Sequence, residues 1–151
     1  MQDEQNKGGF TPDQMIALRK LFYESGSGYL DLFLEELDKI ESQDRSDAVL
    51  ETLHRSIHSL KGAALQLDYL PAGNLALAME RMVKQIRDSD CESSSMSEVV
   101  SLLREGEKRI RLYLDNIIKD EEMDESPVDL LRRFKILADK LISGNDQETA
   151  I

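Results

Sequence analysis

A repeating apolar stripe is the feature that most limits how this chain can fold. Within one segment, apolar side chains recur three and four positions apart, at Leu50, Leu53, Ile57, Leu60, Ala64 and Leu67. Residues of an α-helix are about 100° apart around its axis, so this spacing gathers them on one buried side. Similar stripes recur along the chain, which has no Trp and only 5% aromatic residues. The sequence therefore predicts an all-α protein.

Together with helix-boundary residues, the stripes predict about six helices. Their expected ranges are 12–25, 29–42, 47–67, 71–88, 97–120 and 127–143. A break between the first two is expected at residues 26–28, which read Gly-Ser-Gly. Short connections favour antiparallel neighbours, so helices two to five should form an up-down four-helix bundle, with its core at about 28–120. The first helix would be an extra N-terminal one that caps one end, and the sixth an extra C-terminal one alongside.

The chain is expected to form a single domain over residues 11–143, because 151 residues suffice for one core. Residues 1–10 are polar with two adjacent glycines, and we expect them to be disordered. Residues 144–151 are expected to form a flexible tail. A serine-rich loop is predicted at 88–97 and an acidic linker at 120–126.

Composition argues against several classes of function. The formal net charge of −11 would repel nucleic acid. No apolar run approaches the roughly 18 residues that span a bilayer, and the N-terminus lacks an apolar signal core. A single cysteine, Cys91, excludes an internal disulfide framework. We therefore expect a cytoplasmic protein without membrane contact. We also expect it to be a monomer. No nucleotide loop, metal cluster or Ser/His/Asp arrangement is present, so no cofactor of its own is expected.

The third expected helix carries a group of reactive residues. Residues 58–62 read His-Ser-Leu-Lys-Gly, and the apolar stripe is centred roughly 140° from His58 around the axis. The imidazole is therefore predicted to face solvent or a groove, with Lys61 and Gly62 on its two flanks. His54 and Leu65 lie nearly in line with it. A glycine inside a helix costs about 1 kcal/mol relative to alanine, so Gly62 is expected to let another protein approach.

These residues resemble the histidine-containing phosphotransfer domains of two-component phosphorelays. The family motif is His-x-x-Lys-Gly on the second helix of an antiparallel four-helix bundle, and the resemblance covers roughly residues 28–120. It looks closest to the module of chemotaxis-type histidine kinases, in which a glutamate of the next helix bonds the histidine; Glu80 has the corresponding spacing. Asp68 replaces a frequent glycine and is expected to end the helix, and Leu77 replaces a second histidine.

The resemblance implies a phosphoryl carrier without autonomous kinase activity. The outer ring nitrogen of His58 would attack a phospho-aspartate on a receiver domain, and the receiver would supply the Mg²⁺. Glu80 would accept a hydrogen bond from the other ring nitrogen and fix the tautomer. Lys61 would offset negative charge on the transferred group. Response-regulator receivers and a sensor histidine kinase are the implied partners.

Several neighbours of the imidazole are expected to contact the partner. Gly62 would admit a loop of the receiver, and Arg55 would steer its approach. His54 belongs to the same surface, but no Lys-Gly pair follows it, so we expect it to be a bystander to the chemistry. A receiver typically recognises an apolar surface, which is predicted to include Leu65 and Tyr69.

Two other functions fit the same residues. The chain could be the phosphoacceptor module of a larger hybrid or chemotaxis-type histidine kinase, whose catalytic domain would phosphorylate His58 from ATP. It could also be a regulatory module that docks receivers without carrying phosphate. The polar stretch after Gly144 favours a true chain end, and with it the separate carrier.

Overall fold

The computed structural model describes residues 9–88, 93–121 and 126–149, with the helical backbone but not the side chains of 93–94 and 144–149. These residues contain five α-helices and no strand. The helices are α2 (Pro12–Glu41), α3 (Asp47–Gln66), α4 (Leu70–Asp88), α5 (Ser93–Ile118) and α6 (Val128–Thr149). The predicted all-α class is confirmed. None of these helices combines the length and apolar character that a membrane crossing needs.

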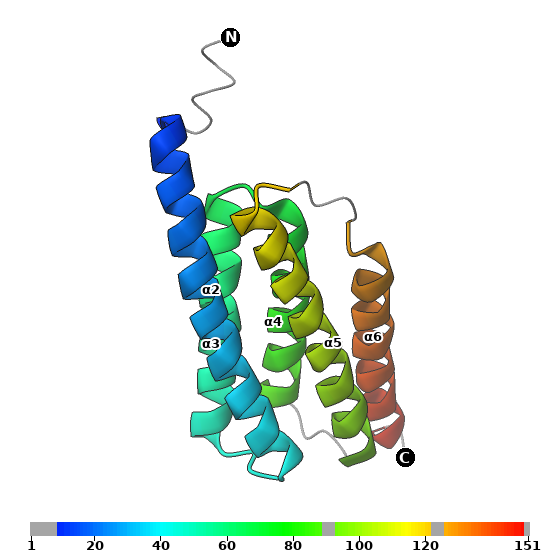
Figure 1. Ribbon diagram of the computed structural model, residues 1–151. Helices are drawn as coiled ribbons and strands as arrows, with labels where there is room; N and C mark the ends of the chain where they lie inside the picture. Colours follow the sequence, from blue (N-terminus) through cyan, green and yellow to red (C-terminus); the bar gives the residue numbers. More distant parts are fainter. Residues whose placement is uncertain (1–8, 89–92, 122–125, 150–151) are drawn as a thin grey trace.

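Helices α2 to α5 form an antiparallel four-helix bundle, and α6 lies beside it (Figure 1). In the bundle, α3 packs between α2 and α4, and α5 closes the ring by packing on α2 and α4. The α6 helix packs on α4 and α5 through three buried side chains, Leu130, Phe134 and Leu137. The extra C-terminal helix is therefore present as predicted.

A separate N-terminal helix was the wrong prediction, because α2 runs unbroken through residues 26–28. Phe22, Gly26, Leu30 and Phe33 are buried along one side of it. A Cβ atom on Gly26 would lie only 3.1 Å from Leu114 Cδ2, so this glycine allows close helix packing. A helical glycine costs about 1 kcal/mol, whereas each large apolar side chain buried gains about 1.5–3 kcal/mol. The free energy gained by burying these side chains therefore outweighs the cost of the helical glycines. The N-terminal part of α2 projects past the bundle (Figure 1).

Two further boundaries differ from the predicted ones. The α5 helix begins at Ser93, so the expected serine-rich loop is partly helical; serine suits the first turn of a helix. The α6 helix continues through Gly144 to Thr149, where a tail was expected, because a single glycine costs too little to end a helix. Residues 1–8, 89–92, 122–125 and 150–151 lie outside the described residues, and with them most of the expected N-terminal disorder, Cys91 and the centre of the acidic linker.

Three helices end in left-handed residues that are not glycine. The residues with positive φ are Gln43 (71°), Asp68 (63°) and Asp120 (56°), after α2, α3 and α5. At the end of α3, Tyr69 N–H donates to Ala64 O at 2.8 Å and Asp68 N–H donates to Leu65 O at 3.1 Å. This pair of bonds is the Schellman motif, in which glycine usually occupies the left-handed position. Asp68 thus ends the helix as expected, and the chain turns directly into α4.

Candidate functional site

The imidazole of His58 faces outward from the middle of α3. Its side chain is 59% exposed, whereas the apolar stripe of the same helix is buried, including Leu53, Ile57 and Leu60. Ser46 caps the helix by accepting a hydrogen bond from the Val49 backbone N–H. The helix period alone predicts this outward direction, because the stripe must turn inward.

A single carboxylate on α4 holds two side chains of α3. Glu80 Oε2 forms a hydrogen bond with His58 Nδ1, and Glu80 Oε1 accepts one from Lys61 Nζ at 2.9 Å. A carboxylate only accepts, so the proton of the imidazole lies on Nδ1 and the lone pair on Nε2. The contact that the family resemblance implies is present in the structure, and Nε2 is the nitrogen left for chemistry.

Burial and hydrogen bonding act in opposite directions on Glu80. Its side chain is only 12% exposed, and this burial raises its pKa. The hydrogen bonds from Lys61 and His58, together with their charges, outweigh burial and hold the pKa below its ordinary value of 4.5. The carboxylate is therefore charged at neutral pH and remains an acceptor for the imidazole.

Lys61 lies half-buried between the two helices rather than free in solvent. Its side chain is 19% exposed, and its ammonium bonds the same carboxylate as the imidazole. The ammonium is thus held within one carboxylate group of the ring, where it can offset negative charge on a group attached to His58.

The surface around Gly62 is open. A Cβ atom built on Gly62 would meet no heavy atom within 4 Å, and the residue is exposed. Gly73 on α4 differs, because a Cβ there would lie 2.4 Å from Leu65 Cδ2. The glycine of α4 therefore serves helix packing under Leu65, whereas Gly62 leaves uncovered backbone beside the imidazole.

The two residues expected to form an apolar docking patch differ in exposure, and their role stays a prediction. Leu65 is exposed next to α4. Tyr69 instead packs its ring against Phe22 of α2, with centroids 5.2 Å apart. Its hydroxyl is buried without a hydrogen-bond partner among the described residues, and burial raises its pKa. Spacing along α3 could not show this, because Tyr69 follows the left-handed turn at Asp68.

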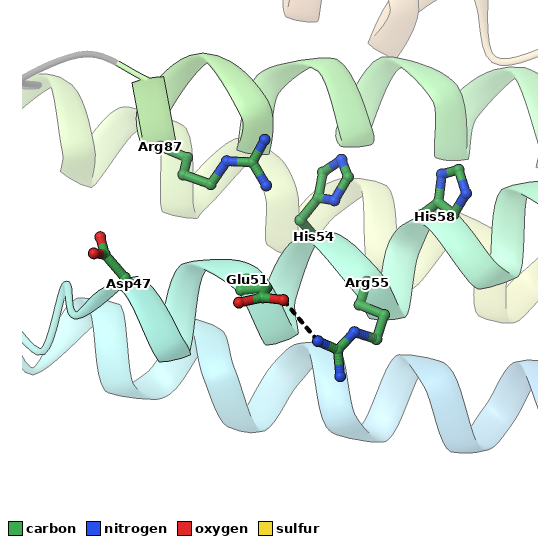
Figure 2. A pocket seen from close by; sticks show the side chains of 6 residues that line it. All are labelled: Asp47, Glu51, His54, Arg55, His58 and Arg87. Atoms are coloured by element: carbon green, nitrogen blue, oxygen red, sulfur yellow. Dashed lines mark hydrogen bonds and ion pairs between the residues drawn. The ribbon is translucent and has the colours of Figure 1, made fainter.

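A pocket of about 300 Å³ extends from His58 toward the N-terminal end of α3 (Figure 2). It is lined by Asp47, Glu51, His54, Arg55, His58 and Arg87. Arg55 Nη2 donates to Glu51 Oε1 at 2.8 Å, and the Arg87 guanidinium of α4 extends toward His54 (Figure 2). Sequence reasoning missed Arg87. Its signal was available, since it lies seven residues, about two turns, beyond Glu80 on the same side of α4.

The described residues contain no group of three or more His, Cys, Asp or Glu side chains that could hold a metal ion. The expectation that magnesium comes from the partner stays a prediction.

Comparison with known families identifies the bundle. A family model described as the Hpt domain matches residues 17–120, more than half of the chain. The match covers most of α2 and all of α3, α4 and α5, and so includes His58, Lys61 and Glu80. The α6 helix lies outside it. No curated protein and no solved structure matches the chain significantly.

Proposed function

This chain belongs to the Hpt domain family, the histidine phosphotransfer modules of two-component signalling, and we propose that it relays a phosphoryl group on His58 from one receiver domain to another. The observation that carries the proposal is the exposed ring of His58, whose Nδ1 is held by Glu80 beside the open backbone of Gly62.

The transfer is a displacement at phosphorus. The Nε2 lone pair of His58 attacks the phosphoryl group of a phospho-aspartate, an N–P bond forms, and the P–O bond to the aspartate breaks with its electrons on the departing carboxylate. The ring then carries a positive charge and its Nδ1 proton, both balanced by the Glu80 carboxylate. Lys61 offsets charge on the phosphoryl oxygens, and a magnesium ion held by the receiver would supply further positive charge there. Attack by an aspartate of a second receiver reverses the step.

The partner would dock over the open side of α3. Gly62 leaves room for a receiver loop, and exposed Leu65 offers it an apolar contact. Arg55 is exposed on the wall of the pocket, where its charge favours approach of an acidic surface. The docking side thus combines a gap, an apolar residue and a cation, each within about two helix turns of His58.

The deciding experiment follows phosphate from a phosphorylated receiver onto this chain. Wild type should acquire acid-labile, base-stable label, and His58→Gln should acquire none, while His54→Gln remains labelled. Equal labelling of wild type and His58→Gln would place the acceptor elsewhere. Labelling of Glu80→Ala should be slower than that of wild type but should not be abolished, because this variant keeps the Nε2 atom of His58.

The same experiment separates the proposal from its alternatives. A module that only docks receivers would bind them without ever forming phosphohistidine. A module whose donor is a kinase domain would be labelled by that kinase and ATP but not by a phosphorylated receiver.

A further inference from the structure

A second imidazole lies one turn away from that of His58 and nearly parallel to it. His54 is one turn earlier on α3, and the two ring centroids are 5.9 Å apart with their planes 19° from parallel. His54 is half-buried in the pocket, between His58 and the guanidinium of Arg87 (Figure 2). The phosphoryl chemistry proposed above makes no use of this ring.

Charged and titratable groups of two helices surround His54. They are Glu51, Arg55 and His58 on α3, and Glu80, Lys84 and Arg87 on α4. Burial, and then the charge of Arg87, lower the pKa of His54, while Glu80 acts in the opposite direction. The ring is therefore neutral at pH 7 and can lie against another ring without repelling it.

One hydrogen bond leaves the reactive ring incompletely fixed. The bond from Nδ1 to Glu80 holds one atom of the imidazole, but the ring can still swing about that atom because His58 is largely exposed. Exposed side chains sample several staggered rotamers. A flat, nearly parallel neighbour would restrict this freedom and favour one direction for Nε2.

We propose that His54 is a positioning residue for His58: its ring backs the reactive imidazole, so that Nδ1 stays on Glu80 and Nε2 points outward. This inference rests on the proposed role of His58 as the acceptor. Arg87 supports it by disfavouring a protonated His54, which would repel the positive charge that the His58 ring acquires on attack. Arg87 acts from α4, so the arrangement requires the packed helix pair.

A spectroscopic test uses the fact that the chain has two histidines. In a sample labelled with ¹⁵N-histidine, the ring signals come from His54 and His58 only. The signals that disappear in His58→Gln are those of His58. In wild type at pH 7.5, the His58 signals should show the Nδ1–H tautomer. His54→Ala should shift them toward a mixture of tautomers. His54→Phe keeps a flat ring without titrating and should restore the wild-type pattern.

Transfer rates test the same variants by function. His54→Ala should be labelled by the phosphorylated receiver about three- to tenfold more slowly, because the ring then divides its time among rotamers. His54→Phe should stay within about twofold of wild type. Gln66→Ala, an exposed change about two turns beyond His58 on α3, is the matched control and should be unaltered.

The outcomes are distinct. Unchanged rate and unchanged His58 signals in His54→Ala would overturn the inference while leaving the relay intact. A His54→Phe variant as slow as His54→Ala would overturn it too, since stacking would not be the cause. Absence of label on wild type would instead remove the proposed function itself.

Discussion

The two oxygens of the Glu80 carboxylate bind different side chains of α3, and the site depends on this division. One oxygen takes the Lys61 ammonium and the other the His58 ring. The carboxylate thereby fixes a tautomer and holds a cation nearby, and it can balance the charge that the ring would acquire in the proposed transfer. A neutral side chain of the same size could fill the space. It would bind the ring N–H and the ammonium less strongly, and it could not balance a positive charge.

Acid stability should reveal the charge of Glu80 and the neutrality of His54 in separate pH windows. The pKa of Glu80 lies below its ordinary 4.5, so the unfolded chain takes up this proton first as pH falls. Its stabilisation is complete above pH 4.5 and is lost as pH falls through the folded value. Glu80→Gln should therefore flatten the decline of the urea midpoint below pH 4.5.

The same reasoning applies to His54 at higher pH. Its pKa lies below the ordinary 6.5, so its stabilisation is complete above pH 6.5 and is lost as pH falls through the folded value. In His54→Phe, the urea midpoint should therefore decline less as pH falls just below 6.5. Its decline below pH 4.5, which is assigned to Glu80, should be unchanged. Glu80→Gln also removes a charge that raises the pKa of His54, so it should enlarge the loss of stability below pH 6.5. His54→Phe leaves Glu80 in place, so a change below pH 4.5 in this variant would contradict the assignment.

Gly62→Ala should separate stability from docking. The new methyl group meets no atom within 4 Å, so the helix should gain about 0.5–1 kcal/mol in free energy of unfolding. If Gly62 admits a receiver loop, transfer from the phosphorylated receiver should nonetheless slow by about tenfold or more. The measurements are urea unfolding and single-turnover labelling.

Gly28→Ala is the matched control for that variant. Gly28 is also helical and exposed, and a Cβ there again meets nothing within 4 Å. It should give the same gain in stability with an unaltered transfer rate. Equal transfer by the two variants would remove Gly62 from the docking surface.

At the scale of the elements, the pairing of α3 with α4 builds the site. The helices run antiparallel, and two contacts join them. His58 contacts Glu80. Leu65, seven residues after His58, contacts Gly73, seven residues before Glu80. Seven residues are close to two helix turns, so both contacts lie on the same facing sides. Close approach at Gly73 therefore sets the register that brings the carboxylate to the imidazole.

Helix ends offer stability that this chain leaves unused. A left-handed conformation costs a residue with a side chain about 1–2 kcal/mol, and less for Asp, whose side chain tolerates it. Gln43→Gly should therefore raise the free energy of unfolding by about 1 kcal/mol, and Asp68→Gly by less. Urea unfolding measures both. Equal or opposite effects would mean that the side chains make compensating contacts.

At the scale of the whole molecule, α6 is an addition to a complete bundle. None of its described side chains lines the site described above, and the helix lies outside the residues that match the family. Ion pairs such as Lys140 with Glu98 and Arg109 with Asp129 join it to α5. Exposed pairs stabilise by about 0–1 kcal/mol each, so the buried apolar side chains carry its attachment.

Phe134→Ala should therefore destabilise the protein without affecting transfer. The ring is 3% exposed, and its loss should cost about 3–5 kcal/mol in free energy of unfolding. Ile136→Ala, on the same helix but 60% exposed, is the control and should change stability by less than about 0.5 kcal/mol. Labelling rates at a temperature where both are folded should equal wild type. A slower Phe134→Ala would give α6 a part in the relay.

Short-range spacing was sufficient for some features of this protein. The helical class, the buried face of α3 and the outward direction of His58 depend only on the period of one helix, so the sequence by itself determined them. The motif of His58, Lys61 and Gly62 is likewise contained in a single turn. Glu80 was foreseen by family resemblance, because spacing within one helix does not reveal a contact to the next.

Tertiary packing decided the remainder. Gly26 could have broken the helix, but it instead packs against Leu114, a residue 88 positions away. The free energy gained by this burial outweighed the local cost of a helical glycine. Tertiary packing likewise placed the Tyr69 ring against Phe22. It also placed Arg87 of α4 in the same pocket as His54 of α3. These outcomes depend on which helix faces meet, and that is a free-energy balance over the whole core rather than a property of any one segment.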